Sequence, residues 1–321
     1  MLTCAILDDY QEAGLAMADW SRLGGRVETK VFRDPFPDAA TAAAALQGVG
    51  IVVAMRERTP FDAALFRALP DLKLLVTTGM RNASIDLAAA AASGVTVCGT
   101  EGYATSTAEL TWGLILAVMR QIPQEHDALR RGGRWQSSLG RDLNGLRLGI
   151  VGLGKLGGRV ARYGRAFDMQ VSAWSRSLTD ARAAELGIER AATLDALLEA
   201  ADVVSIHLVL APQTRGLIGA RELALMKPRA VLVNTSRGPI VDEAALLEAL
   251  QSGRIGGAAL DVFDTEPLPA GHPLRQAGNL IATPHLGYVT ENTYRIFYGQ
   301  AVEDIAAWLD GTPVRVLAAP G

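Results

Sequence analysis

The chain has 321 residues, of which 49% are hydrophobic and 20% are charged, and its formal net charge at pH 7 is −3. The length predicts two domains, because single hydrophobic cores rarely grow beyond about 250–300 residues. The slightly negative charge disfavours a nucleic-acid binder, which needs a basic surface for phosphates. Two cysteines, Cys4 and Cys98, are too few for a disulfide framework or a structural zinc site. We therefore expect a reducing compartment and no metal.

The start of the chain and its apolar segments predict a cytoplasmic protein. The first ten residues, MLTCAILDDY, lack the basic region and apolar run of a signal peptide. The longest apolar stretch with helical character, Leu110 to Met119, is about half as long as a membrane span.

Short apolar strands and helical segments alternate through the first hundred residues, which is typical of an α/β fold with a parallel sheet. We expect helices at Ala39–Leu46 and Ile85–Ala92. The expected strands are Thr3–Leu7, Val27–Phe32, Ile51–Ala54, Leu74–Thr77 and Val95–Cys98. A long helical stretch, Thr105–Arg131, follows and is interrupted near Pro123. We expect this stretch to connect the first unit to the next.

A second alternating unit follows, and it has enough strands for a doubly wound sheet. The expected strands are Leu146–Val151, Gln170–Trp174, Val203–His207, Ala230–Asn234, Gly257–Asp261 and Leu280–Thr283. The expected helices are Gly158–Phe167, Leu178–Ala184, Ala192–Ala200, Arg221–Met226 and Glu243–Gln251. The last helical segment, Glu291–Leu309, has no strand left to serve in this unit, so we expect it to return to the first one.

A G-x-G-x-x-G run, residues 152–157, lies between a predicted strand and a predicted helix. That setting is the one in which the run binds a dinucleotide. Gly152 permits a tight turn, Gly154 lets the backbone approach a pyrophosphate, and Gly157 lets the helix pack closely on the strand. The free N–H groups of the helix start then face the phosphates. The alternative is a turn whose glycines serve packing alone.

The residues after the next strand bear on the choice between NAD and NADP. An acidic residue about 20 positions beyond the fingerprint usually binds the ribose 2′-hydroxyl. Here Ser175 stands where an Asp is expected, and Arg176 follows it. Without the carboxylate a 2′-phosphate is not repelled, and Arg176 could pair with it. The pattern leans to NADP, although a solvated Arg176 would leave the choice open.

Three side chains suited to catalysis follow three successive predicted strands. They are Arg237, Glu266 and His285. Arg forks onto a carboxylate and a neighbouring carbonyl oxygen, and His exchanges a proton near neutral pH. A Glu on the other ring nitrogen fixes the tautomer and stabilises the protonated ring. This set predicts reduction of a 2-oxo acid, although singly each residue could be a surface ion pair, a turn cap or a turn residue.

The chain closely resembles the D-isomer-specific 2-hydroxyacid dehydrogenase family, in its short form without a regulatory domain, as in glyoxylate-hydroxypyruvate reductases and phosphoglycerate dehydrogenase-like proteins. The matching stretches are LRLGIVGLGKLGGRVAR, DVVSIHLVLAPQTRGLIG, MKPRAVLVNTSRGPIVDEAALLEAL, GAALDVFDTEPLP and NLIATPHLGYVT. The resemblance implies an oxidoreductase that transfers a hydride between NAD(P)(H) and a small D-2-hydroxy or 2-oxo acid. It also implies that Arg237, Glu266 and His285 form the family's catalytic triad.

The resemblance implies two Rossmann-like or flavodoxin-like doubly wound parallel-sheet domains with an active-site cleft between them. Residues 1–100 with 291–321 would be the substrate domain and 101–290 the NAD(P)-binding domain. A homodimer built mainly on the nucleotide domains, with Thr105–Arg131 contributing, is also implied. The implied cofactor contacts beyond the fingerprint glycines are Lys155, Leu156, Ser175, Arg176, Leu208, Thr235, Ser236, Asp261, His285, Leu286 and Gly287. Asp261 would accept a hydrogen bond from the carboxamide.

The expected substrate loop departs from the family pattern. The family often has a G-x-D-N-[IV]-D-like run there, whereas this chain has Gly79-Met80-Arg81-Asn82-Ala83-Ser84-Ile85-Asp86. We take Arg56, Met80 and Arg81, together with Arg237, as substrate-binding candidates. Two extra cations would suit a phosphorylated or dicarboxylic acid, although Arg81 could equally be an exposed loop residue.

Two other functions fit the same scaffold. One is a formate or phosphite dehydrogenase. The other is a dinucleotide-sensing protein of the corepressor kind, which would need a partner-binding surface or tail. The complete triad favours an enzyme. Apart from Arg315–Gly321, we expect no disordered tail that could bind a partner.

Overall fold

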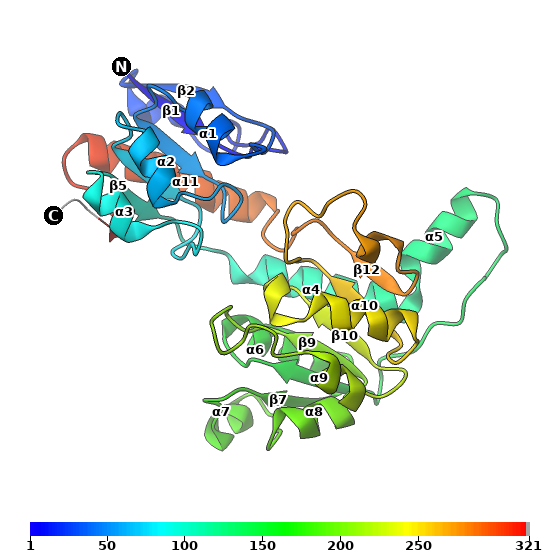
Figure 1. Cartoon of the computed structure of the whole chain (residues 1–321). Helices are drawn as coiled ribbons and strands as arrows, with labels where there is room; N and C mark the ends of the chain where they lie inside the picture. The colour runs from blue at the N-terminus through cyan, green and yellow to red at the C-terminus, as the bar shows by residue number, and fades with distance from the viewer. Residues whose placement is uncertain (319–321) are drawn as a thin grey trace. The chain divides into compact units, whose positions relative to one another are not determined.

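The computed structural model describes residues 1–318, which fold as two α/β units (Figure 1). Unit 1 consists of Met1–Tyr103 with Val289–Gly321, and unit 2 is Ala104–Tyr288. The first boundary thus falls at Tyr103, where the sequence suggested residue 100, and the return falls at Val289, where it suggested 291. The last three residues of the expected substrate domain lie outside the described part of the chain. The role of unit 1 in substrate binding and the cleft stay predictions.

The sheet of unit 1 has the strand order β13-β5-β4-β3-β1-β2. Its strands are β1 (Leu2–Ile6), β2 (Val27–Val31), β3 (Ile51–Ala54), β4 (Leu74–Thr77), β5 (Thr96–Gly99) and β13 (Val316–Ala318). Its helices are η1 (Trp20–Leu23), α1 (Ala39–Ala45), α2 (Ala63–Ala68), α3 (Leu87–Ala92) and α11 (Glu291–Leu309). All residues of β3, β4 and β5 are buried, as their near-continuous apolar sequences require of central parallel strands.

The last helix, α11, belongs to unit 1, as the sequence analysis expected. It buries a stripe of aromatic and aliphatic side chains, among them Phe297, Tyr298 and Ile305. The buried carboxylate of Asp304 accepts a hydrogen bond from Arg315 Nε at 2.9 Å, and this pair lies just before β13. β13 was not predicted, because a three-residue edge strand that runs antiparallel to β5 has too little apolar pattern to be recognised.

The sheet of unit 2 has the strand order β12-β11-β10-β9-β6-β7-β8, and every pairing in it is parallel. Its strands are β6 (Arg147–Val151), β7 (Gln170–Trp174), β8 (Glu189–Arg190), β9 (Val203–Ile206), β10 (Val231–Asn234), β11 (Gly257–Leu260) and β12 (Leu280–Ala282). Its helices are α4 (Ala104–Arg120), α5 (Ile122–Arg130), α6 (Lys155–Ala166), α7 (Asp180–Glu185), α8 (Leu194–Ala200), α9 (Ala220–Leu225), α10 (Glu243–Gln251) and the short η2 (Gly238–Ile240) and η3 (Pro273–Gln276).

Each face of this sheet has its own hydrophobic core. One core packs α8, α9 and α10 against the sheet, and the other packs α4 and α6 against the opposite face. These helices on both faces of a parallel sheet confirm the doubly wound α/β fold expected from the sequence. The break expected near Pro123 is also confirmed: α4 ends at Arg120, Gln121 takes a left-handed conformation (φ 53°), and Pro123 lies in the first turn of α5. Among the described residues no helix is long and apolar enough to cross a membrane.

Candidate functional site

The strand order of unit 2 reverses between β6 and β9, and ligands of open α/β sheets bind at the carboxyl ends of strands at such a point. β6 leads into the glycine fingerprint. On the other side of the switch, β9 is followed by β10, β11 and β12, and Arg237, Glu266 and His285 follow these three strands in turn. Because all the strands are parallel, the fingerprint and the three candidate catalytic residues lie at one edge of the same sheet.

The three fingerprint glycines occupy the conformations that the dinucleotide motif requires. Gly152 has φ 103°, and a Cβ there would lie 2.6 Å from the carbonyl oxygen of His207. Gly154 is the N-cap of α6, and a Cβ on it would meet no described atom within 4 Å, so the backbone is open to a ligand at this position. A Cβ on Gly157 would lie 2.1 Å from the carbonyl oxygen of Gly152. The loop therefore fits a pyrophosphate at the positive end of α6.

The other predicted cofactor residues are placed along the same edge. Lys155 and Leu156 begin α6, where Lys155 is exposed and Leu156 half-buried. Ser175 is half-buried directly after β7, and Arg176 is exposed with no ion pair among residues 1–318. Leu208 is half-buried after β9. The structure thus leaves the guanidinium of Arg176 available to a charged ligand.

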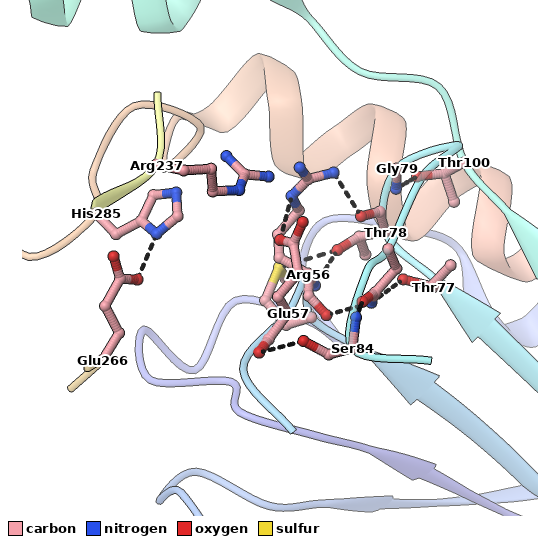
Figure 2. A network of polar contacts seen from close by, with 12 residues as sticks. Arg56, Glu57, Thr77, Thr78, Gly79, Ser84, Thr100, Arg237, Glu266 and His285 are labelled. Carbon is pink, nitrogen blue, oxygen red and sulfur yellow. Dashed lines mark hydrogen bonds and ion pairs between the residues drawn. The ribbon is translucent and has the colours of Figure 1, made fainter. Parts of the chain in front are cut away.

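Glu266 and His285 meet directly. His285 Nδ1 lies 2.6 Å from Glu266 Oε2 (Figure 2). Oε1 of the same carboxylate accepts a hydrogen bond from the Phe263 amide at 2.8 Å. His285 has a left-handed backbone (φ 53°), and its ring contacts Tyr288 edge-on at 5.2 Å between centroids. The carboxylate holds the ring through Nδ1, so Nε2 is the ring nitrogen that Glu266 does not engage.

Arg237 is positioned by a tight loop after β10. Asn234 Nδ2 donates to the Arg237 carbonyl at 2.9 Å, and Arg237 Nη1 donates to the Ser236 carbonyl at 2.7 Å. A Cβ on Gly238 would lie 2.1 Å from the carbonyl carbon of Phe263. Only glycine fits there, so the loop of Arg237 is packed against the segment that leads to Glu266.

Asp261 organises the loop that carries His285. Its buried carboxylate accepts hydrogen bonds from Thr283 Oγ1 (2.6 Å) and from the amides of Leu286 (2.7 Å) and Gly287 (2.8 Å). Burial raises the pKa of Asp261, and these donors oppose the rise by stabilising the charged form. The resemblance assigned Asp261 to the nicotinamide carboxamide; the structure adds that the same carboxylate fixes the backbone on both sides of Leu286.

Two threonines of α4 support the same edge and were not predicted as site residues. Thr107 Oγ1 donates to the Gly287 carbonyl at 2.9 Å, and the hydroxyls of Thr111 and Thr235 lie 2.8 Å apart. These contacts join residues 180 and 124 positions apart, so no local sequence signal could have found them. Ser236, the other predicted residue of this loop, donates from its hydroxyl to the Ile206 carbonyl at 2.8 Å.

In unit 1 the substrate candidates lie at the carboxyl ends of β3 and β4. Arg56 has φ 52°, and its Nη1 donates to the Thr78 carbonyl at 3.0 Å (Figure 2). A Cβ on Gly79 (φ 105°) would lie 1.9 Å from that Nη1, so this glycine makes room for the guanidinium. Met80 and Arg81 are exposed, and Arg81 has no ion pair among residues 1–318. The structure thus orders Arg56 and leaves Arg81 in solvent. Neither unit's described residues contain a cluster of three or more metal-ligating side chains.

Known proteins resemble this chain over most of its length. The NAD binding domain model of the D-isomer specific 2-hydroxyacid dehydrogenases matches residues 112–287. The glyoxylate reductase of Aeropyrum pernix is 40% identical over 259 residues, covering 78% of this chain and 77% of that protein. The D-3-phosphoglycerate dehydrogenase of Bacillus subtilis is 38% identical over 263 residues, covering 81% of this chain but 50% of that protein, so this chain matches half of it.

A solved structure agrees with these matches. The crystal structure of a putative D-3-phosphoglycerate dehydrogenase from Ralstonia solanacearum is 40% identical, with a TM-score of 0.94, and covers 99% of this chain and 97% of that one. The chain therefore belongs to the D-isomer specific 2-hydroxyacid dehydrogenase family, a family of NAD-linked oxidoreductases.

Proposed function

We propose that this protein reduces a small 2-oxo acid to its D-2-hydroxy acid, or catalyses the reverse oxidation, with His285 as general acid or base. The observation that carries the proposal is the 2.6 Å contact between His285 Nδ1 and Glu266 Oε2. It leaves Nε2 as the proton donor and fixes the ring orientation, which acid–base catalysis requires. Glu266 also stabilises the positive charge of the ring before the proton leaves.

In this proposal Arg237 holds the substrate. A guanidinium can donate to the substrate carboxylate and to the carbonyl oxygen beside it, and the planar fork aligns the two. A bound reduced dinucleotide would supply the hydride that the carbonyl carbon accepts, and His285 Nε2 would give its proton to the carbonyl oxygen. Arg237 offsets the negative charge that develops on that oxygen, which lowers the barrier.

We propose NAD(H) or NADP(H) as the cofactor, with a lean to the phosphorylated form. Ser175 brings no carboxylate to the ribose position, and the exposed Arg176 has no ion pair in the described part of the chain. A free guanidinium can pair with a 2′-phosphate, whereas an Asp in place of Ser175 would repel it.

We infer that the substrate carries a second anionic or strongly polar group, read by unit 1. Arg56 supports this inference because the Thr78 carbonyl orders its guanidinium, as a binding group should be ordered before the ligand arrives. Arg81 adds a second, exposed cation to the same unit. Arg56 also pairs with Glu57 at 3.6 Å, so Arg81 is the more exposed of the two cations, and a phosphorylated or dicarboxylic 2-oxo acid offers this unit the second anionic group that glyoxylate lacks.

We further propose a homodimer formed through unit 2. The segment from α5 to β6 projects from the end of α4 (Figure 1), and α5 buries none of its side chains. Its exposed apolar residues are Ile122, Leu129, Trp135 and Leu139. Large apolar side chains that gather on a projecting segment typically mark an interface, and a second copy of this chain is the partner we infer.

A substrate panel tests the proposed reaction. Nicotinamide absorbance is followed with NADH and NADPH separately, using glyoxylate, hydroxypyruvate, 3-phosphohydroxypyruvate and 2-oxoglutarate. We expect turnover with at least one of these acids. Tight cofactor binding without turnover of any of them would favour a dinucleotide sensor instead.

A further inference from the structure

His207, at the carboxyl end of β9, has a ring nitrogen with no partner. Its Nε2 lies 2.9 Å from Ser205 Oγ, whereas Nδ1 is buried and forms no hydrogen bond among residues 1–318. Burial lowers the pKa of His207 to about 3, so the imidazole is neutral at physiological pH. A buried polar atom without a partner costs free energy, and such atoms in folded proteins commonly await a water or a ligand.

The position of His207 points to a ligand. Along β9, Val204 and Ile206 face the core of α8–α10, while Val203 faces that of α4 and α6. Because side chains alternate along a strand, Ser205 and His207 lie on the α4–α6 side, the side on which the glycine fingerprint begins α6.

The neighbours of His207 across the sheet belong to the expected cofactor site. Its amide donates to the Val151 carbonyl at 2.8 Å, and its own carbonyl abuts Gly152. On the other side Asn234 pairs with Ile206, so Thr235 follows level with His207. The ring therefore stands at the switch point, between the fingerprint and the loop of Thr235.

The tautomer follows from Ser205. Among the described residues, the Ser205 hydroxyl forms a hydrogen bond only with the His207 ring. We therefore infer that the hydroxyl donates its single proton to Nε2, which accepts it. Nδ1 then carries the ring proton and is a buried donor.

We propose that His207 is a positioning residue for the cofactor, whose Nδ1–H donates a hydrogen bond to an oxygen of the bound dinucleotide. The proposal rests on the dinucleotide-binding function proposed above. A dinucleotide offers hydroxyl and phosphate oxygens at the switch point, and a neutral donor can bind either kind. Binding would then relieve the unmet donor, and Ser205 would hold the ring in the orientation that the bond needs.

Two substitutions of His207 separate this role from plain packing. In His207→Asn the amide nitrogen stands as many bonds from Cα as Nδ1, whereas in His207→Gln it stands as far out as Nε2. The Asn variant thus keeps a donor in the place of Nδ1, whereas the Gln variant keeps only a polar group in the place of Nε2, next to Ser205. The probes are NADH and NADPH, each titrated by its own fluorescence, with thermal unfolding of every variant as the control for folding.

We expect His207→Gln to raise the cofactor Kd about tenfold, the usual effect of losing one buried hydrogen bond. His207→Asn should bind within about threefold of the wild type. The KM for the cofactor should follow the Kd, while kcat at saturating cofactor should change little. If His207→Gln does not fold, His207→Ala replaces it with the same expected loss.

Equal affinities for the wild type and the Gln variant, or equal losses in the Asn and Gln variants, would overturn the proposal. A wild-type protein that binds neither NADH nor NADPH would instead overturn the proposed function itself, so the two failures are distinct. Because the ring stays neutral, the wild-type Kd should contain no step from His207 between pH 5 and 8; such a step, absent from His207→Asn, would contradict the assigned donor.

Discussion

His285 Nδ1 lies 2.6 Å from Glu266 Oε2, although the two residues are 19 positions apart in the chain. They meet because each follows one of two neighbouring parallel strands, β11 and β12, whose carboxyl ends share an edge of the sheet. A further hydrogen bond fixes each of them. The Phe263 amide donates to the Glu266 carboxylate, and the Asp261 carboxylate accepts from the amides of the two residues that follow His285. Such a supported pair can keep one tautomer of the ring through a reaction cycle.

Replacing His285 by Gln should lower kcat by about 10²–10⁴-fold, because the proton donor is lost. Glu266→Gln should lower kcat less, since the ring remains but its protonated form is no longer stabilised. Direct titration with NADH should give a nearly unchanged Kd for both variants. Unchanged turnover in His285→Gln would remove this residue from the acid–base role.

Arg237→Lys should lower kcat/KM for the 2-oxo acid about a hundredfold, because an ammonium cannot donate two parallel bonds to the substrate. The charge is kept, so a loss that appears in this variant measures the geometry of the fork. Steady-state kinetics at saturating cofactor provide the measurement. Wild-type kinetics in Arg237→Lys would show that the substrate is held elsewhere.

Ser175→Asp should shift the cofactor preference toward NADH. Two like charges about 4 Å apart in water repel by about 1 kcal/mol, which corresponds to about a fivefold change in the ratio of kcat/KM for NADPH over NADH. Ser177→Asp is the matched control, because it adds the same charge to an exposed position of the same loop. If the NADPH-to-NADH ratio of kcat/KM changes equally in both variants, the added charge acts at long range, and position 175 does not contact the adenosine ribose.

Trp135→Ser combined with Leu139→Asp should dissociate the proposed dimer, since both apolar side chains are exposed on the segment after α5. Light scattering during size-exclusion chromatography measures the mass directly. Leu15→Asp, which makes the same leucine-to-aspartate change on the exposed surface of unit 1, should leave the mass unchanged. A wild-type mass of one chain at micromolar concentration would contradict the dimer.

Asp304→Asn should change how stability depends on pH. Burial raises the pKa of Asp304 to about 7 from 3.8, even though Arg315 opposes the rise. Because the folded-state pKa lies above the unfolded one, the contribution of this carboxyl to stability is fully present below about pH 4 and is lost as pH rises through 7.

An uncharged Asn keeps an acceptor for Arg315 without that loss. The variant should therefore gain stability relative to the wild type on going from pH 5 to pH 8, by up to a few kcal/mol at about 1.4 kcal/mol per pKa unit. Urea midpoints at the two pH values measure the change, and Glu303→Gln, on the exposed partner of Arg315, is the control. Parallel pH profiles for wild type and Asp304→Asn would refute the assignment.

The elements that sequence patterns predict well here are those whose pattern is local. The central strands read as apolar runs, and the break before α5 follows from Pro123. The glycine fingerprint also carries part of its own geometry, because a Cβ on Gly157 would collide with the carbonyl oxygen of Gly152, five residues earlier. The return of α11 to unit 1 could be inferred only from the absence of a partner strand in unit 2.

Features that depend on distant contacts were not predictable from one sequence. β13 pairs with a strand more than 200 positions away, and α2 is too short to show a helical period. Thr107 and Thr111 look like ordinary helix residues until the fold brings them to Gly287 and Thr235. In the sequence, His207 looks like the last residue of a buried strand. Only the packing shows that its Nδ1 has no hydrogen-bond partner among the described residues.

The central claim is that His285, held by Glu266, donates the proton and Arg237 binds the substrate when a hydride reduces a 2-oxo acid. The most direct measurement follows the oxidation of NADH and NADPH by wild type and His285→Gln with the four 2-oxo acids. The account predicts turnover by the wild type with at least one acid and its loss in the variant, with cofactor affinity retained. Cofactor binding without turnover of any acid, or equal turnover by both proteins, would contradict it.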